Sequence, residues 1–66
     1  MKNRIRVARA EVRMTQQQLA EAIGVSRQTI NAIESGKFVP STVLALKMAQ
    51  FFEKPVEEIF MLDDED

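Results

Sequence analysis

The fold of this chain is decided by residues 15–37, which read TQQQLAEAIGVSRQTINAIESGK. Thr15 carries a hydroxyl that can accept a hydrogen bond from a free amide of the next helical turn, and Gln18 completes the pattern of a capping box. A helix is therefore predicted over about residues 16–23. Gly24 follows, where a helix ends and the chain needs a residue that tolerates positive φ.

A further helix begins almost at once. Ser26 is its predicted N-cap, and the helix covers residues 27–35 and ends at Ser35-Gly36. Two helices joined so tightly must cross at a steep angle rather than lie antiparallel. Ile30 and Ile33 point inward at helical spacing, together with Val25 from the turn.

Helical spacing extends to both sides of this pair. Upstream, a helix is predicted over about residues 3–12, with an inward stripe formed by Ile5, Ala8 and Val12. Downstream, Ser41 caps a helix over residues 42–52, whose inward side carries Leu46, Ala49 and Phe52. Pro55 suits the first turn of a short final helix over residues 56–60.

Strand signals are missing, because the chain has no sustained period-two alternation and no Asn-Gly or Asp-Gly hairpin turn. The predicted class is all-α, a compact five-helix domain over residues 1–62, followed by an acidic, solvated tail at 63–66. The predicted core side chains are Leu19, Ile23, Ile30, Ile33, Leu46, Phe52, Ile59 and Phe60.

Composition argues against several functional classes. The chain has no Cys, His, Tyr or Trp, so it lacks the commonest general bases, thiol nucleophiles and metal ligands. No Gly-rich loop follows a strand to bind a nucleotide. We therefore expect no catalysis, no metal and no cofactor, and no small-molecule pocket is evident. No apolar run approaches the ~20 residues that span a bilayer, and there is no signal-peptide segment, so we expect a soluble, cytoplasmic protein.

The net charge of -1 hides an uneven distribution. Residues 1–40 carry seven basic and three acidic side chains, whereas residues 41–66 carry two basic and seven acidic ones. A basic half suits a surface that faces phosphate. Ordinary solvated faces explain the same pattern equally well.

The outer face of the helix over residues 27–35 is polar and carries Arg27, Gln28 and Asn31, with Ala32 beside them. Arg pairs with guanine and Gln or Asn with adenine in the major groove. Residues near the N-terminus of such a helix reach the base edges first. These side chains are candidates for base readout, and the alternative is a merely solvated face.

The spacing of Gln16, Leu19-Ala20, Gly24-Val25-Ser26, Ile30, Glu34-Ser35-Gly36 and Pro40 resembles the lambda-repressor-like, Xre/Cro family of regulators. The resemblance covers nearly the whole chain. It implies a five-helix fold, operator binding through the helix over residues 27–35, and two-fold symmetry. Ala32 departs from the polar residue that some members have, so readout there is an apolar contact with a thymine methyl or is absent.

Carried over position by position, the resemblance assigns phosphate contact and support of the reading residues to Thr15, Gln16, Gln17, Ser26, Thr29, Ser35, Gly36 and Lys37. Helix capping alone is the other reading of Thr15, Gln16 and Ser26. The family often pairs the positions of Arg9 and Glu34 in a structural salt bridge. Contact with flanking backbone or plain solvation remains open for Arg4, Arg6 and Arg13.

The implied partner is an operator in double-stranded DNA, bound by a homodimer that represses transcription. One such domain offers only about 600–1,000 Å² of DNA contact, so pairing two half-sites is the natural remedy. Candidate interface residues are Val43, Val56, Phe60, Met61 and Leu62, several of which could equally be buried within one copy. The rival function is an antitoxin or adaptor that also binds a protein, and the few residues after the last helix favour a stand-alone regulator.

Overall fold

Hydroxyl side chains begin the three central helices where the sequence predicts. The computed structural model describes residues 1–66 and places α2 at Gln16–Ile23, α3 at Arg27–Glu34 and α4 at Thr42–Phe52. In each case the preceding hydroxyl side chain accepts a hydrogen bond from the backbone amide three residues later, and these caps are Thr15, Ser26 and Ser41. The Thr15 and Gln18 side chains form the complete capping box. All three predicted N-caps are confirmed.

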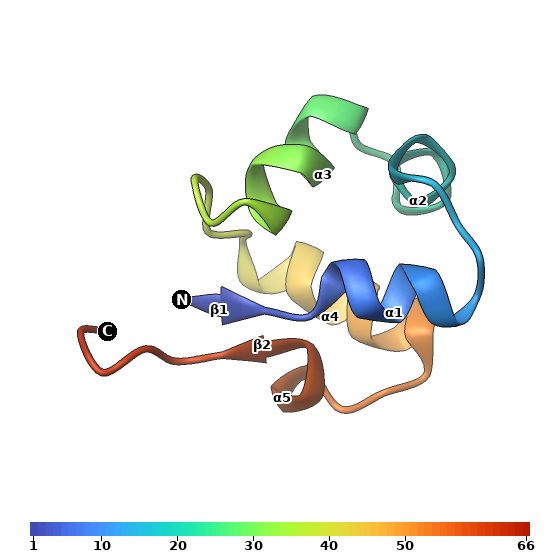
Figure 1. Cartoon of the computed structure of the whole chain (residues 1–66). Coiled ribbons are helices and arrows are strands. Elements are labelled where there is room, and N and C mark those ends of the chain that lie inside the picture. The colour runs from blue at the N-terminus through green and yellow to red at the C-terminus, as the bar shows by residue number, and fades with distance from the viewer.

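Glycine in the left-handed region ends α2. Gly24 has φ 88° and forms its C-cap, as predicted. Gly36 has φ 80° and follows the Ser35 C-cap of α3, which turns the chain into the loop before α4. The turn at Gly24 allows α2 and α3 to lie close together at a steep angle, as the end-on view of α2 beside α3 shows (Figure 1).

The first helix is shorter than predicted. α1 spans Ile5–Glu11, because Asn3 is in extended backbone and its side-chain oxygen accepts a hydrogen bond from the Ile5 amide at 3.3 Å. Val12 is the C-cap residue and is 53% exposed. Its predicted place in the inward stripe is therefore wrong, whereas Ile5 and Ala8 are buried as expected.

A short strand pair closes the fold, which the sequence did not predict. After α5 (Val56–Ile59), β2 (Phe60–Met61) lies antiparallel to β1 (Lys2–Asn3), with Lys2 opposite Met61. The Arg4 amide extends the ladder by donating to the Ile59 carbonyl at 2.8 Å. Strands of two residues are too short to show alternation, and the protein remains an all-α domain with a minor sheet.

Every helix contributes to one apolar core. Its twelve buried side chains are Ile5, Ala8, Leu19, Ala20, Ile23, Ile30, Ile33, Met48, Ala49, Phe52, Ile59 and Phe60. The predicted core residue Leu46 is instead 50% exposed, and Met48 is completely buried. α4 is apolar on most of its surface, so the pattern of its residues did not identify which side faces inward.

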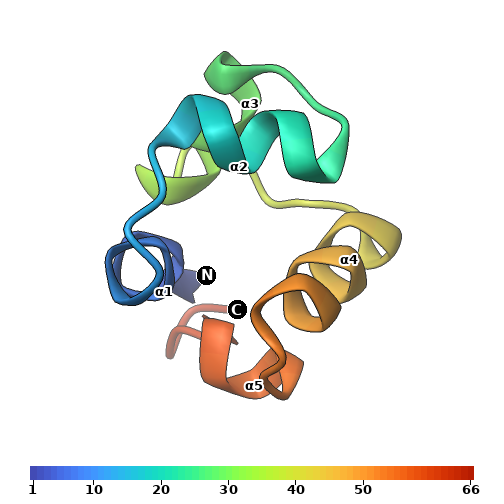
Figure 2. The same cartoon turned by 90° about the vertical axis from the view of Figure 1, so that its right-hand side faces the viewer.

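The helices surround this core on all sides. Figure 2 shows α1 and α4 on opposite sides, with α2 and α3 across one end and α5 across the other. The C-terminal segment runs beside β1, away from α3 (Figure 1). None of the helices combines the length and apolar character that crossing a membrane requires. The fold therefore leaves one complete side of the α2–α3 pair uncovered.

Candidate nucleic-acid interface

The uncovered side of α3 carries the polar side chains that the sequence singled out. Ile30 and Ile33 are buried against the core at 0% and 1% exposure. Arg27, Gln28 and Asn31 are exposed on the opposite side of the same helix. All three lie within the first five residues of α3, where the N-terminal end of a recognition helix contacts bases.

A buried carboxylate fixes this helix to α1. The Glu34 side chain is 1% exposed and pairs with Arg9 through two hydrogen bonds, of 2.7 Å from Nε and 3.1 Å from Nη2. The third nitrogen of Arg9, Nη1, donates to the Met14 carbonyl at 2.7 Å. Arg6 adds a longer ion pair at 3.6 Å. The predicted Arg9–Glu34 salt bridge is confirmed.

The ion pair keeps Glu34 charged although it is buried. Burial raises the pKa of the Glu34 carboxyl, but the hydrogen bonds from Arg9 and Gln16 and the charges of Arg9 and Arg6 together outweigh it. The net result is a pKa below the ordinary value of 4.5. Glu34 is therefore a permanent anion at neutral pH and accepts hydrogen bonds only.

Gln16 links this anion to the exposed face of α3. Its Nε2 donates to Glu34 Oε1 at 3.2 Å and to Asn31 Oδ1 at 3.2 Å. Because the carboxylate can only accept, Gln16 must turn its NH₂ group toward Glu34, and the second hydrogen then meets the Asn31 oxygen. No hydrogen bond uses the NH₂ group of Asn31. This NH₂ group is free to donate to a purine N7, a guanine O6 or a thymine O4 in a major groove.

Several residues predicted to support phosphate contact form hydrogen bonds within α2 or α3. The hydroxyls of Ser26 and Thr29 lie 3.0 Å apart at the start of α3. Ser35 donates to the Ala32 carbonyl at 3.1 Å at its other end. Gln17, by contrast, donates to Glu21 along α2 at 3.0 Å. The structure thus places Ser26 and Thr29 together, whereas the hydrogen bond of Gln17 stays within α2.

Two exposed cations of this region have no anionic partner. The ion pairs of the chain involve Lys2, Arg6, Arg9, Lys54 and the Met1 amino group. Arg27 at the start of α3 and Lys37 after its end form none. Their charges therefore remain available to an anionic partner such as the phosphate backbone.

Sequence reasoning missed two side chains beside α3. Asn3 Nδ2 donates to the Ile33 carbonyl at 2.9 Å and ties β1 to the last turn of α3. Phe38 is 50% exposed in the loop after α3, next to Ala32. An aromatic residue directly after Gly36-Lys37, in the loop between two predicted helices, was the available signal for the second.

The predicted dimer residues do not share one environment. Phe60 is 8% exposed and belongs to the core of its own chain, so it is not available to a second copy. Val56 and Met61 are half-buried. Val43 and Leu62 are 64% and 77% exposed and remain candidates for an interface.

The acidic tail is exposed at residues 64–66 and also contacts the N-terminus. Its carboxylates Asp63 and Asp66 form ion pairs with the Met1 amino group at 3.0 and 3.1 Å. The Asp63 amide also donates to Asp66 at 2.7 Å, which closes a turn. The Met1 amino group donates hydrogen bonds to the Asp63 and Asp66 carboxylates, which raises its pKa. The contact keeps this negative charge away from α3 (Figure 1).

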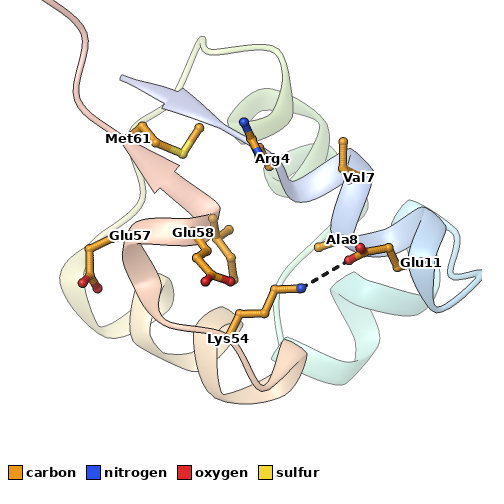
Figure 3. A pocket seen from close by; sticks show the side chains of 9 residues that line it. Arg4, Val7, Ala8, Glu11, Lys54, Glu57, Glu58 and Met61 are labelled. Carbon is orange, nitrogen blue, oxygen red and sulfur yellow. Dashed lines mark ion pairs between the residues drawn. The ribbon is translucent and has the colours of Figure 1, made fainter.

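A separate hollow of about 410 Å³ lies between α1, α5 and β2 (Figure 3). Arg4 and Met61 lie on one side of it, and Lys54 forms an ion pair with Glu11 across it at 3.5 Å. Glu57 and Glu58 add negative charge to its rim. None of the residues that line this hollow belongs to α3. The hollow is therefore separate from the exposed face of α3.

The chain is similar to known helix-turn-helix regulators over its whole length. The sequence model of the helix-turn-helix family matches residues 5–59. An HTH-type transcriptional regulator of Methanocaldococcus jannaschii is 50% identical over 66 residues, which is 100% of each chain. One of Archaeoglobus fulgidus is 47% identical over 100% of this chain and 94% of its own. The regulator YgzD of Bacillus subtilis is 45% identical over 98% of both chains. This chain belongs to the lambda-repressor-like helix-turn-helix family and is a DNA-binding transcriptional regulator.

Proposed function

We propose that the protein represses transcription as a homodimer that occupies two half-sites of an operator, with α3 of each copy in the major groove. The observation that supports this most is the outer face of α3. Three exposed polar side chains project from a helix that a buried ion pair holds in place. Such a face provides base readout.

Base readout is assigned to Arg27, Gln28, Asn31 and Ala32. Arg27 and Gln28 are the first two residues of α3, and their side chains are exposed. The NH₂ group that Gln16 leaves free on Asn31 reads an acceptor on a base edge. Ala32 makes an apolar contact.

Phosphate contact is assigned to the ends of the two helices. The first-turn amides of α2, preceded by Thr15, and of α3, preceded by Ser26, lack helical partners and favour anions. Ser35, Gly36 and Lys37 are exposed after α3 and contact the backbone on the other side of the groove. Gln16 supports Asn31 and Thr29 supports Ser26.

Two copies provide the contact area that a specific site needs. A single domain buries about 600–1,000 Å², and recognition helices in a dimer lie ~34 Å apart, one turn of duplex. Val43 and Leu62 are the most exposed large apolar side chains and suit the interface between copies. The acidic tail lies away from α3 and therefore does not oppose the approach of DNA (Figure 1).

A charge substitution tests the phosphate contact. Lys37→Ala is expected to weaken binding to every duplex by a similar factor, because a phosphate contact carries no sequence information. The slope of log affinity against log salt should become shallower by about 0.9 for each contact removed. Lys47→Ala removes the same charge from the exposed surface of α4 and serves as the control. Equal slopes for both variants and the unaltered protein would remove Lys37 from the interface.

A further inference from the structure

A shallow hollow lies on the exposed side of α3 and extends from its first turn to the loop that follows the helix. It measures about 250 Å³ and is lined by Gln28, Thr29, Ala32 and Phe38. The amides of Lys37 and Phe38 both donate to the Ala32 carbonyl, at 2.9 and 3.2 Å. These two hydrogen bonds fix the loop against the last turns of α3. The Phe38 ring is therefore held at the wall of the hollow although it is 50% exposed.

The lining offers little to a polar ligand. Ala32 and Phe38 are apolar, and the Thr29 hydroxyl already contacts the Ser26 hydroxyl at 3.0 Å. Gln28 alone brings a polar group without a partner, at the edge nearest the N-terminus of α3. The hollow thus has Gln28, a candidate for base readout, at one edge and the apolar side chains of Ala32 and Phe38 along its wall. Apolar side chains do not stabilise an anionic phosphate.

We propose that Ala32 and Phe38 bind the 5-methyl group of a thymine, at the base step next to the one that Gln28 reads. The inference rests on the proposed function, because it requires α3 to lie in the major groove. The base edges of that groove present hydrogen-bond donors and acceptors and a single kind of apolar group, the thymine methyl. The thymine methyl is therefore the group of the major groove that an apolar hollow on the exposed face of α3 would bind. Phe38 becomes a specificity-determining residue outside the recognition helix.

Uracil isolates the methyl group, since it pairs as thymine does and lacks only that group. The DNA is a duplex that the protein selects from random sequences. Each of its thymines is replaced with uracil in turn, and the affinity is measured by fluorescence anisotropy. Burial of one methyl group predicts about a fourfold loss at one thymine position in each half-site. Replacement at thymines outside this step should leave the affinity unchanged. A site with no such position overturns the proposal.

Variants of the loop identify the receptor. In Phe38→Ala, the thymine-to-uracil ratio at the sensitive position should fall toward one. Val39→Ala is the matched control, because Val39 is 60% exposed in the same loop and does not line the hollow. It should keep the fourfold ratio. An unchanged ratio in Phe38→Ala contradicts the assignment of Phe38.

The outcomes separate this inference from the proposed function. Specific binding that depends on Gln28 but is equal for thymine and uracil at every position leaves the proposed function standing and removes the methyl receptor. Failure to bind any duplex removes both. The comparison of the two bases uses the unaltered protein, so its result does not depend on whether a variant folds.

Discussion

Replacing Arg9 with methionine is expected to lower the free energy of unfolding by about 3 kcal/mol, because it leaves the Glu34 carboxylate buried without its main partner. The Glu34 side chain is 1% exposed, and Arg9 provides the two shortest of its hydrogen bonds. Arg6, whose Nε lies 3.6 Å away on an exposed side chain, replaces little of that interaction. The loss is a large part of the stability of a small domain and should be measured by urea denaturation.

A second substitution shows whether the unpaired charge is the cause. In Arg9→Met combined with Glu34→Gln the buried anion is gone, so the double variant should be more stable than Arg9→Met alone. Glu34→Gln alone should also be destabilised, because Arg9 then loses the charge of its partner. Stability losses that simply add in the double variant would contradict a coupled pair.

The same pair predicts how stability changes with pH. The folded state holds the pKa of Glu34 below its ordinary value of 4.5. A group with a lowered pKa stabilises the folded state fully above its unfolded pKa, and this contribution is lost as the pH falls through the folded pKa. Unfolding midpoints of the parent and of Glu34→Gln should therefore converge as the pH is lowered below 4.5. A constant difference between them across that range would be inconsistent with an ionised Glu34.

Replacing Gln28 with alanine is expected to weaken binding to the preferred site by about 1–3 kcal/mol at each half-site and to relax the preference at one base step. Gln28 is exposed on the first turn of α3, and its amide suits bidentate pairing with adenine. The measurement is titration of the variant against duplexes that carry each of the four base pairs at every position. The preference should disappear at one position and persist elsewhere.

A matched substitution controls for general effects of the change. Gln50 is an exposed glutamine of α4, away from α3, so Gln50→Ala should bind all duplexes as the parent does. Equal specificity profiles for Gln28→Ala and the parent would remove Gln28 from the reading face. A uniform loss over all sequences would instead identify it as a backbone contact.

Local chemistry explains why the starts of α2, α3 and α4 and the end of α2 were predictable. Hydroxyl caps and left-handed glycines act within one turn of the backbone, so Thr15, Ser26, Ser41 and Gly24 could be placed from sequence alone. Which side of α4 faces inward depends on packing against other helices, because apolar residues occur on several sides of this helix. Leu46 was therefore assigned to the core in place of Met48. The pairing of β1 with β2 is likewise set by the rest of the fold.

The candidate site was predictable in its residues but not in its connections. The exposed face of α3 follows from helical spacing, and the pairing of Arg9 with Glu34 followed from the family resemblance. The bridge from Glu34 through Gln16 to Asn31 joins α3 to α2 by two hydrogen bonds of 3.2 Å, and these depend on how the two helices pack. Phe38 belongs to a loop, and only the fold brings it beside Ala32.

Selection of bound sites from random duplex DNA is the most direct test that α3 reads paired bases in a symmetric dimer. The expected result is a palindromic consensus whose half-sites lie about one helical turn, ~34 Å, apart, with a thymine in each half-site. Enrichment of no sequence at low ionic strength, or of a single unrepeated half-site, would contradict it.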